Sequence, residues 1–196
     1  MAGRPRQFDK DSTLKQALDV FLEKGYEGSS LDDLCTAMGI TRPSLYKAYG
    51  NKEALFLAAL STYRDRFIEQ VKAILESESN GKQAIRQLLT WIDNEHTAEE
   101  TPTGCLVVNS GIICNEGYPQ IADKIAILHD QRENILFERL KRAHEEGQLK
   151  ADTDPRALAQ YINGILQGIA VLARGQRKPE VIHNIVALAN LTLDQV

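Results

Sequence analysis

The chain has 196 residues, of which 43% are hydrophobic, and only 13 are glycine and 6 proline. No stretch is long and apolar enough to span a membrane or to serve as a secretory signal, so we expect a cytoplasmic protein with no membrane partner. Its three cysteines lack metal-ligand spacing, which argues against a disulfide scaffold or a zinc site, and we expect no metal.

The charge is unevenly distributed along the chain. The formal net charge is −4, but residues 1–52 carry a balance of +1 and residues 53–196 a balance of −5. A protein that coats nucleic acid over its whole surface is therefore excluded, whereas a local anion-binding face near the N-terminus is not.

Apolar residues recur at helical spacing from end to end, and no sustained alternation of apolar and polar residues predicts a strand. We expect an all-α protein of about nine helices. The first ends at Gly25. The second runs from an N-cap at Ser30 to Gly39, and the third, with Thr41 as N-cap and Pro43 in its first turn, ends near Gly50.

A long fourth helix begins after Asn51, and its apolar positions continue to Leu75. Five further helices are predicted from apolar periodicity and helix-breaking residues, over residues 84–92, 106–114, 121–140, 154–169 and 181–193. We predict two domains, residues 1–50 and residues 51–196.

The second and third helices, joined by a Gly-containing turn, fit the helix-turn-helix arrangement, which lays its second helix in the major groove of DNA. The polar groups predicted to face outward can bind phosphate oxygens or guanine acceptors; they are Thr41, Arg42, Ser44, Tyr46 and Lys47, with Lys52 opening the fourth helix. Arg4 and Arg6 flank Pro5 on an arm that could reach a minor groove. The alternatives are a helix pair that serves only core packing and an arm that is only a solvated tail.

Between Asp11 and Leu60 the chain strongly resembles the N-terminal domain of the TetR family of bacterial transcription regulators. The resemblance rests on the segment "GYEGSSLDDLCTAMGITRPSLYKAYGNKEALF", with its Gly-Tyr pair, the Ser before the second helix, the Leu-Tyr pair in the third and the Lys-Glu-Ala-Leu opening of the fourth. It covers about the first third of the chain. It implies a homodimer on double-stranded operator DNA, with the following positions at or beside the DNA: Ser30, Thr41, Arg42, Pro43, Ser44, Tyr46, Lys47 and Lys52.

The last two helices carry more apolar surface than one subunit's core needs. The eighth contains Gly164 and Gly168, four residues apart, which permits close approach of another helix. The resemblance implies that these helices pair with their copies as a four-helix bundle, and the predicted interface residues are Gly164, Ile165, Gly168, Ile169, Ile182, Ile185 and Ala189. The alternative is complete burial within one subunit.

The resemblance also implies an effector pocket enclosed by helices four to seven. Candidate lining residues, each of which could equally be ordinary core or surface, are Phe67, Trp91, Asn109, His129 and Phe137. Cys105, in "TPTGCLVVNSG", is predicted to open the sixth helix, where a helix N-terminus favours the nucleophilic thiolate. Its Gly-Cys-Leu segment resembles one found in a subset of TetR-type regulators, some of which sense electrophiles or oxidants. The alternative is a buried, inert thiol.

We therefore expect a homodimeric DNA-binding repressor that a small molecule, an electrophile or thiol modification releases from a near-palindromic operator. A rival hypothesis is a helix-turn-helix protein that acts as a protein-binding antirepressor without touching DNA. The sequence contains no nucleophile–base pair, metal cluster or phosphate-binding glycine loop, so we expect neither an enzyme nor a cofactor.

Overall fold

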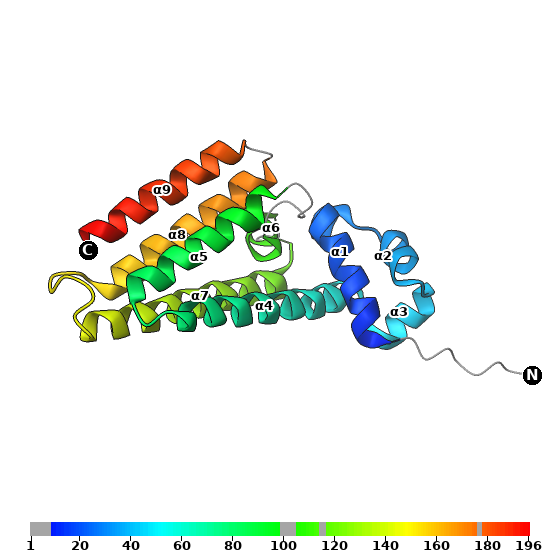
Figure 1. Ribbon diagram of the computed structural model, residues 1–196. Helices are drawn as coiled ribbons and strands as arrows, with labels where there is room; N and C mark the ends of the chain where they lie inside the picture. Colours follow the sequence, from blue (N-terminus) through cyan, green and yellow to red (C-terminus); the bar gives the residue numbers. More distant parts are fainter. Residues whose placement is uncertain (1–8, 99–104, 114–116, 176–177) are drawn as a thin grey trace, which may run out of the picture. The chain divides into compact units, whose positions relative to one another are not determined.

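The computed structural model describes residues 9–98, 105–113, 117–175 and 178–196, and these residues form helices without strands (Figure 1). Nine helices lie in this part of the chain: α1 (Lys10–Gly28), α2 (Leu31–Met38), α3 (Arg42–Tyr49), α4 (Lys52–Ser77), α5 (Gly81–Thr97), α6 (Leu106–Ile113), α7 (Pro119–Glu145), α8 (Pro155–Arg174) and α9 (Pro179–Gln195). The predicted all-α architecture is confirmed.

The predicted helix caps form. Ser30 and Asp33 make a complete capping box at α2: the Asp33 amide donates to Ser30 Oγ at 3.0 Å and the Ser30 amide donates to Asp33 Oδ2 at 2.9 Å. Asn51 caps α4, because its Oδ1 accepts from the Ala54 amide at 2.7 Å. Each cap satisfies an amide at the start of a helix that has no partner within the helix.

Two glycines redirect the backbone in the first part of the chain. Gly25 has a φ of 71° inside α1, so the helix is interrupted where the sequence predicted its end and a further short helical segment continues to Gly28. Gly39 has a φ of 62° and ends α2. Side chains other than glycine rarely adopt these left-handed values, which explains the residue type at both turns.

The chain divides into two compact units, Met1–Tyr63 and Arg64–Val196, so that the boundary falls within α4. In the first unit the rings of Phe21 and Tyr26 from α1 lie 4.9 and 5.0 Å from the ring of Phe56 in α4. The division predicted at residues 50 and 51 would place all of α4 in the second domain. The start of α4 instead belongs to the first unit, since Phe56 is part of its core.

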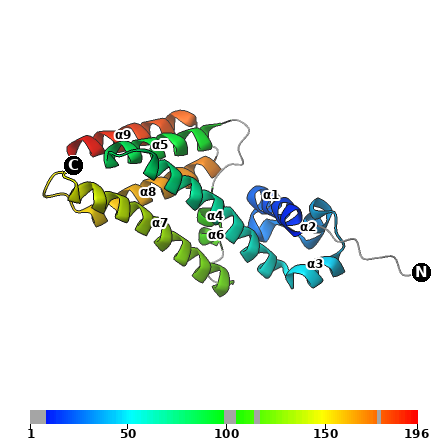
Figure 2. The ribbon, with the colours of Figure 1, turned by 60° about the horizontal axis from the view of Figure 1, so that its bottom comes forward.

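The second unit is a stack of helices around one apolar core. Helix α8 packs against α7 and α9, α5 packs against α7, α8 and α9, and α6 packs against α7 and α8. Both views show α9 running beside α5 (Figures 1 and 2). The C-terminal half of α4 enters the same core through Val71 and Leu75.

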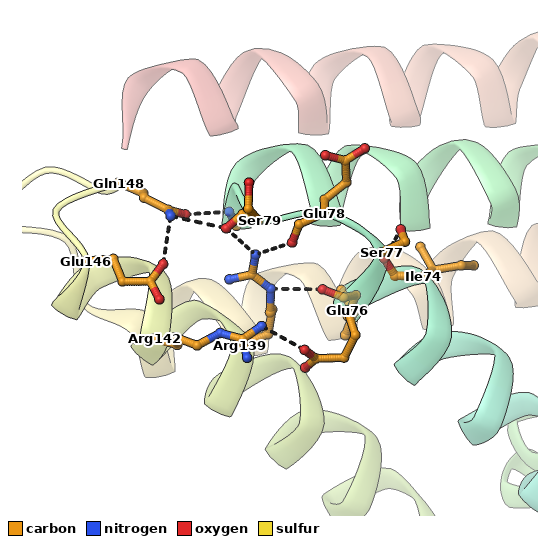
Figure 3. A network of polar contacts seen from close by, with 11 residues as sticks. Ile74, Glu76, Ser77, Glu78, Ser79, Arg139, Arg142, Glu146 and Gln148 are labelled. Carbon is orange, nitrogen blue, oxygen red and sulfur yellow. Dashed lines mark hydrogen bonds and ion pairs between the residues drawn. The ribbon is translucent and has the colours of Figure 1, made fainter.

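The guanidinium of Arg139 holds the corner between α4 and α5 against α7 (Figure 3). Arg139 is 3% exposed, and it donates from Nε to the carbonyl oxygen of Leu75 at 2.9 Å. Its Nη2 donates to the carbonyl oxygens of Glu78 and Ser79 at 2.9 and 3.1 Å. The cation thus satisfies one carbonyl in the last turn of α4, where the helix dipole is negative, and two in the segment that follows α4.

The same corner brings α5 very close to α7. A Cβ atom built on Gly81 would lie 2.4 Å from the Cβ of Ala143 and 3.0 Å from Nη1 of Arg139. The amide of Gly81 donates to the side-chain oxygen of Gln148, whose Nε2 donates to the carbonyl oxygen of Ser79 at 3.2 Å. Only glycine fits between the two helices here.

None of the helices in the described ranges combines the length and the apolar character that a membrane span requires.

Candidate DNA-binding interface

The turn between α2 and α3 is built by backbone hydrogen bonds. The amides of Gly39 and Ile40 donate to the carbonyl oxygens of Thr36 and Cys35 at 3.2 and 3.1 Å, which closes the end of α2. Thr41 follows immediately as the N-cap of α3. The second helix of the pair therefore starts directly after the turn, as a helix-turn-helix requires.

Helix α3 separates a buried anchor from an exposed polar face. Leu45 is fully buried. Arg42, Pro43, Tyr46 and Lys47 are exposed, and 47% of Tyr46 is accessible. The residues predicted to face a ligand therefore lie at the surface of the first unit.

The predicted hydroxyl contacts also serve as helix caps. Thr41 Oγ1 accepts from the Ser44 amide at 3.4 Å and lies 3.0 Å from Ser44 Oγ. Ser30 has the equivalent position at α2, and its Oγ donates to Asp33 at 2.7 Å. Each hydroxyl carries one proton, so whichever of Thr41 and Ser44 accepts in their mutual contact can still donate to a phosphate oxygen, whereas the Ser30 proton is already bound to Asp33.

Tyr49 is part of the structural framework of the first unit. Its hydroxyl lies 2.9 Å from Thr13 Oγ1 and donates to the carbonyl oxygen of Lys10 at 3.1 Å. The ring also lies under the Lys10 ammonium at 5.7 Å. These contacts fix the C-terminal end of α3 to the start of α1.

Two cations of the proposed interface, Arg42 and Lys52, have defined contacts. Arg42 forms a two-pronged ion pair with Asp32 of α2, from Nε to Oδ1 at 3.0 Å and from Nη2 to Oδ2 at 2.7 Å. Hydrogen bonding to Asp32 raises the pKa of the Arg42 guanidinium, which remains charged. The Lys52 ammonium lies 4.5 Å from the centre of the Tyr26 ring.

A second ion pair, Lys24 with Asp33 at 2.6 Å, lies at the start of α2. Hydrogen bonds from Lys24 and Ser30 lower the pKa of the Asp33 carboxyl. Sequence reasoning recognised the cap but did not predict either ion pair, because each joins residues on different helices and depends on how those helices cross. Arg4 and Arg6 lie outside the described residues.

The predicted effector residues occur as separate clusters in the second unit. The ring centres of Phe67 and Trp91 lie 5.5 Å apart, and the centre of the Phe137 ring lies 3.6 Å from the Arg156 guanidinium carbon. His129 Nδ1 lies 3.3 Å from Nη2 of Arg132. The fifth candidate, Asn109, belongs to α6, and its side chain lies outside the part of the chain that the structure describes.

Arg132 is a buried polar residue that sequence reasoning missed. It is 6% exposed, and its Nε donates to Asn163 Oδ1 at 2.6 Å, joining α7 to α8. The sequence does contain a pattern that indicates this burial, because Arg132 and Arg139 share the apolar face of α7 with Leu128 and Leu136 at helical spacing.

The surface of the second unit has two grooves. One of about 600 Å³ lies between α4 and α7 and mixes cations with carboxylates, including Lys72, Glu76 and Arg142. Another of about 500 Å³ lies along α5 and includes Trp91. In the described part of the chain, no group of three or more His, Cys, Asp and Glu residues could hold a metal ion.

Two of the three cysteines lie in the described ranges, and both are buried. Cys105 is 6% exposed and directly precedes α6. Cys35 lies in the core of the first unit, and burial raises the pKa of its thiol. Cys114 lies outside the described residues.

The structure divides the predicted dimer residues between two faces. Gly164 and Gly168 are exposed, and Ile165 and Ile185 are half-buried. Three others instead pack in the subunit's own core at 0–1% exposure: Ile169, Ile182 and Ala189. Large apolar side chains on the exposed surfaces of α8 and α9 were not predicted; they are Tyr161, Val171, Val181, Leu188 and Leu191.

Comparison with known proteins matches both parts of the chain. Residues 14–59 match the model of bacterial regulatory proteins of the tetR family, and residues 81–188 match the tetracyclin repressor-like C-terminal domain. The chain is 35% identical to the HTH-type transcriptional repressor ComR of Escherichia coli, over 88% of this chain and 82% of that protein. It is 36% identical to the uncharacterized HTH-type transcriptional regulator YezE of Bacillus subtilis, over 88% and 89%.

A solved structure supports the same assignment. It is a three-cysteine variant of the TetR family transcriptional regulator CifR in complex with 26-base-pair double-strand operator DNA. The match has a TM-score of 0.89 and 34% identity, and it covers 96% of this chain and 98% of that chain. The helix-turn-helix unit and the helical second unit thus match in both sequence and structure, and the chain belongs to the TetR family of bacterial transcriptional regulators.

Proposed function

We propose that the protein is a homodimeric transcriptional repressor that binds double-stranded operator DNA through α3. The observation that carries this proposal is the exposed face of α3, where Arg42, Tyr46 and Lys47 surround the buried anchor Leu45. Such a face offers charged and hydroxyl donors to phosphates and base edges. Relatives support the same role, since ComR is named a repressor and CifR was solved on operator DNA.

The proposed homodimer pairs α8 and α9 with their copies. These helices expose Leu188 and Leu191 at 64% and 60%, which is unusual for large apolar side chains on one subunit alone. A two-fold dimer presents two copies of α3 to successive major grooves, about 34–36 Å apart, and therefore favours a near-palindromic operator.

The test is selection of genomic fragments by the purified protein, followed by sequencing and gel-shift titration. We expect a near-palindromic site, including one near the protein's own promoter, that competes with unrelated DNA at physiological salt. Failure to form any specific complex at low salt would instead favour the antirepressor hypothesis, in which the same fold binds a protein.

Release from the operator is proposed to follow a population shift. An effector that binds one packing of the second unit better than another shifts the equilibrium by its difference in affinity. The effector is a small molecule or an electrophile that modifies Cys105, whose position directly before α6 would couple its modification to the packing of that helix.

The thiol hypothesis has its own experiment. An alkylating reagent is expected to label Cys105 before Cys35 and to abolish operator binding, while Cys105→Ser binds the operator but no longer responds to the reagent. Mass spectrometry identifies the labelled residue and gel shift measures binding. A Cys105→Ser protein that responds to the reagent as the wild type does would refute the role of Cys105 and assign the response to another thiol.

A further inference from the structure

The ion pair between Asp32 and Arg42 lies on the proposed DNA-binding face and is open to solvent. Side-chain exposure is 54% for Arg42 and 73% for Asp32, yet the two groups meet in the two-pronged geometry that matches a carboxylate to a guanidinium. Asp32 lies in the first turn of α2 and Arg42 in the first turn of α3. The pair therefore sets the direction of an arginine at the beginning of the proposed recognition helix.

The geometry leaves one edge of the guanidinium available. A guanidinium carries five N–H donors in a rigid plane, and Asp32 occupies the edge formed by Nε and Nη2. The edge formed by Nη1 and the second Nη2 proton points away from the carboxylate. Two parallel donors of this kind match O6 and N7 of guanine, which is the commonest base-specific contact in the major groove.

A carboxylate on a surface that approaches DNA needs an explanation, because it repels every phosphate equally. Solvent-exposed ion pairs contribute little to stability, so the fold itself does not require Asp32 at this place. The neighbouring Asp33 has a structural task in the capping box, whereas both oxygens of Asp32 accept from Arg42. Asp32 repels phosphates, whereas the Arg42 side chain that it holds can still bond a base edge. Asp32 therefore weakens non-specific binding to DNA more than it weakens a base contact.

We propose that Asp32 is a positioning residue that orients Arg42 to read a guanine in each half-site and that lowers binding to DNA of unrelated sequence. The inference rests on the proposed function, because it assigns a specificity role within the same interface. It predicts a G·C pair in each half of the operator whose recognition depends on both residues.

The experiment uses the full-length protein and the selected operator. Fluorescence anisotropy measures the dissociation constant for the operator, for duplexes in which each G·C pair is replaced in turn, and for an unrelated duplex. For the wild type, we expect replacement of the guanine read by Arg42 to weaken binding about 10-fold or more. In Asp32→Asn the same replacement should cost less than about 3-fold, and affinity for the unrelated duplex should rise.

Three further variants complete the experiment. Asp19→Asn removes an exposed carboxylate of α1 from the same unit and should leave discrimination at the guanine unchanged. Asp32→Glu keeps the charge and should retain most of the discrimination. Adding Asp32→Asn to Arg42→Ala should change discrimination no further, because the proposed effect acts through Arg42. Thermal melting checks that each variant is folded.

The possible failures are distinguishable. Unchanged guanine discrimination in Asp32→Asn, or equal loss of affinity for every duplex, would overturn the role of Asp32 while leaving the regulator proposal intact. The absence of any specific complex with the wild-type protein would overturn both proposals.

Discussion

Individual side chains of the first unit carry both structure and the proposed recognition. Thr41 begins α3 as its N-cap and is also a candidate phosphate contact, and Tyr49 ends the same helix with hydrogen bonds to α1. Leu45 anchors the helix between them. The polar face of α3 is therefore held by neighbouring residues before any DNA is bound, which reduces the ordering cost of binding.

Lys52 provides the residue-scale prediction. Replacement by Ala is expected to weaken binding to all DNA sequences alike and to reduce the slope of log K against log salt by about 1, since one phosphate contact is lost. Arg42→Ala or Lys47→Ala should also relax sequence preference where the residue reads a base. Binding titrations from low to high salt measure both quantities.

The control for Lys52→Ala is Lys141→Ala, which removes an equal charge from an exposed residue of the second unit. It should leave the salt slope unchanged. A salt slope for Lys52→Ala equal to that of the wild type would remove Lys52 from the phosphate contacts and restrict it to its contact with the Tyr26 ring.

At the scale of helices, the corner between α4 and α5 is a junction that depends on particular residues. Arg139 binds three carbonyl oxygens at the end of α4, and Gly81 allows α5 to approach Ala143 of α7 (Figure 3). Burial lowers the pKa of the Arg139 guanidinium, but its hydrogen bonds offset part of the cost of desolvation. The C-terminal end of α4 is thus fixed to α7.

Replacing Arg139 by Met is therefore expected to lower the free energy of unfolding by about 2–4 kcal/mol, because the buried carbonyl of Leu75 and the part-buried carbonyls of Glu78 and Ser79 lose their donors. Urea unfolding followed by circular dichroism measures this change. Arg142→Met is the matched control: Arg142 pairs with Glu76 at the surface at 3.1 Å, and its loss should cost less than about 1 kcal/mol. Equal losses in the two variants would contradict the capping role of Arg139.

At the scale of the whole molecule, the glycines of α8 give a test of dimerisation. A Cβ atom at Gly164 or Gly168 would meet nothing within 4 Å in the subunit, so alanine there should strengthen the helix by about 1 kcal/mol per site. Against a closely packed partner helix, the added methyl groups should instead weaken dimerisation about 10-fold or more. Sedimentation over a range of protein concentrations measures the dimer dissociation constant.

The control for the double variant Gly164→Ala/Gly168→Ala is Gly28→Ala, in the first unit. A Cβ atom at Gly28 would lie 3.7 Å from the Cβ of Lys24, which is an ordinary van der Waals distance. Its dimer dissociation constant should equal that of the wild type. If the Gly164→Ala/Gly168→Ala protein dimerises as the wild type does, the two glycines lie outside the interface.

Stability of the molecule should also depend on pH through two partly buried histidines. Burial lowers the pKa of His96, and burial together with Arg132 lowers the pKa of His129. The unfolded chain therefore binds more protons than the folded chain once the pH falls below the ordinary histidine pKa of about 6.5. The free energy of unfolding should decrease from pH 7.5 to 5.5, by at most about 1.4 kcal/mol per pH unit for each histidine.

Urea unfolding at several pH values, with a His96→Gln/His129→Gln variant beside the wild type, tests this dependence. The variant should show a flatter profile across the same window, since neutral glutamine binds no proton in either state. An identical slope in both proteins would assign the pH dependence to other groups.

The sequence by itself determined the helices, their caps and the outward face of α3. Those features depend on residues a few positions apart: Ser30 with Asp33, Thr41 with Ser44, and the spacing that buries Leu45 while exposing Arg42. Such local relations follow from helical geometry, so a single sequence suffices to predict them. The family resemblance in the first third of the chain, which matched this pattern, was confirmed over both units.

Only the tertiary structure decided which groups meet across helices. Periodicity marks Ile169, Ile182 and Ala189 as apolar but cannot tell a face buried within one subunit from a face left for another, and the structure buries all three. The pairing of Asp32 with Arg42 and the binding of Arg139 to the end of α4 depend on crossing angles between helices. Packing of residues distant in the chain sets those angles, so helical spacing alone does not contain them.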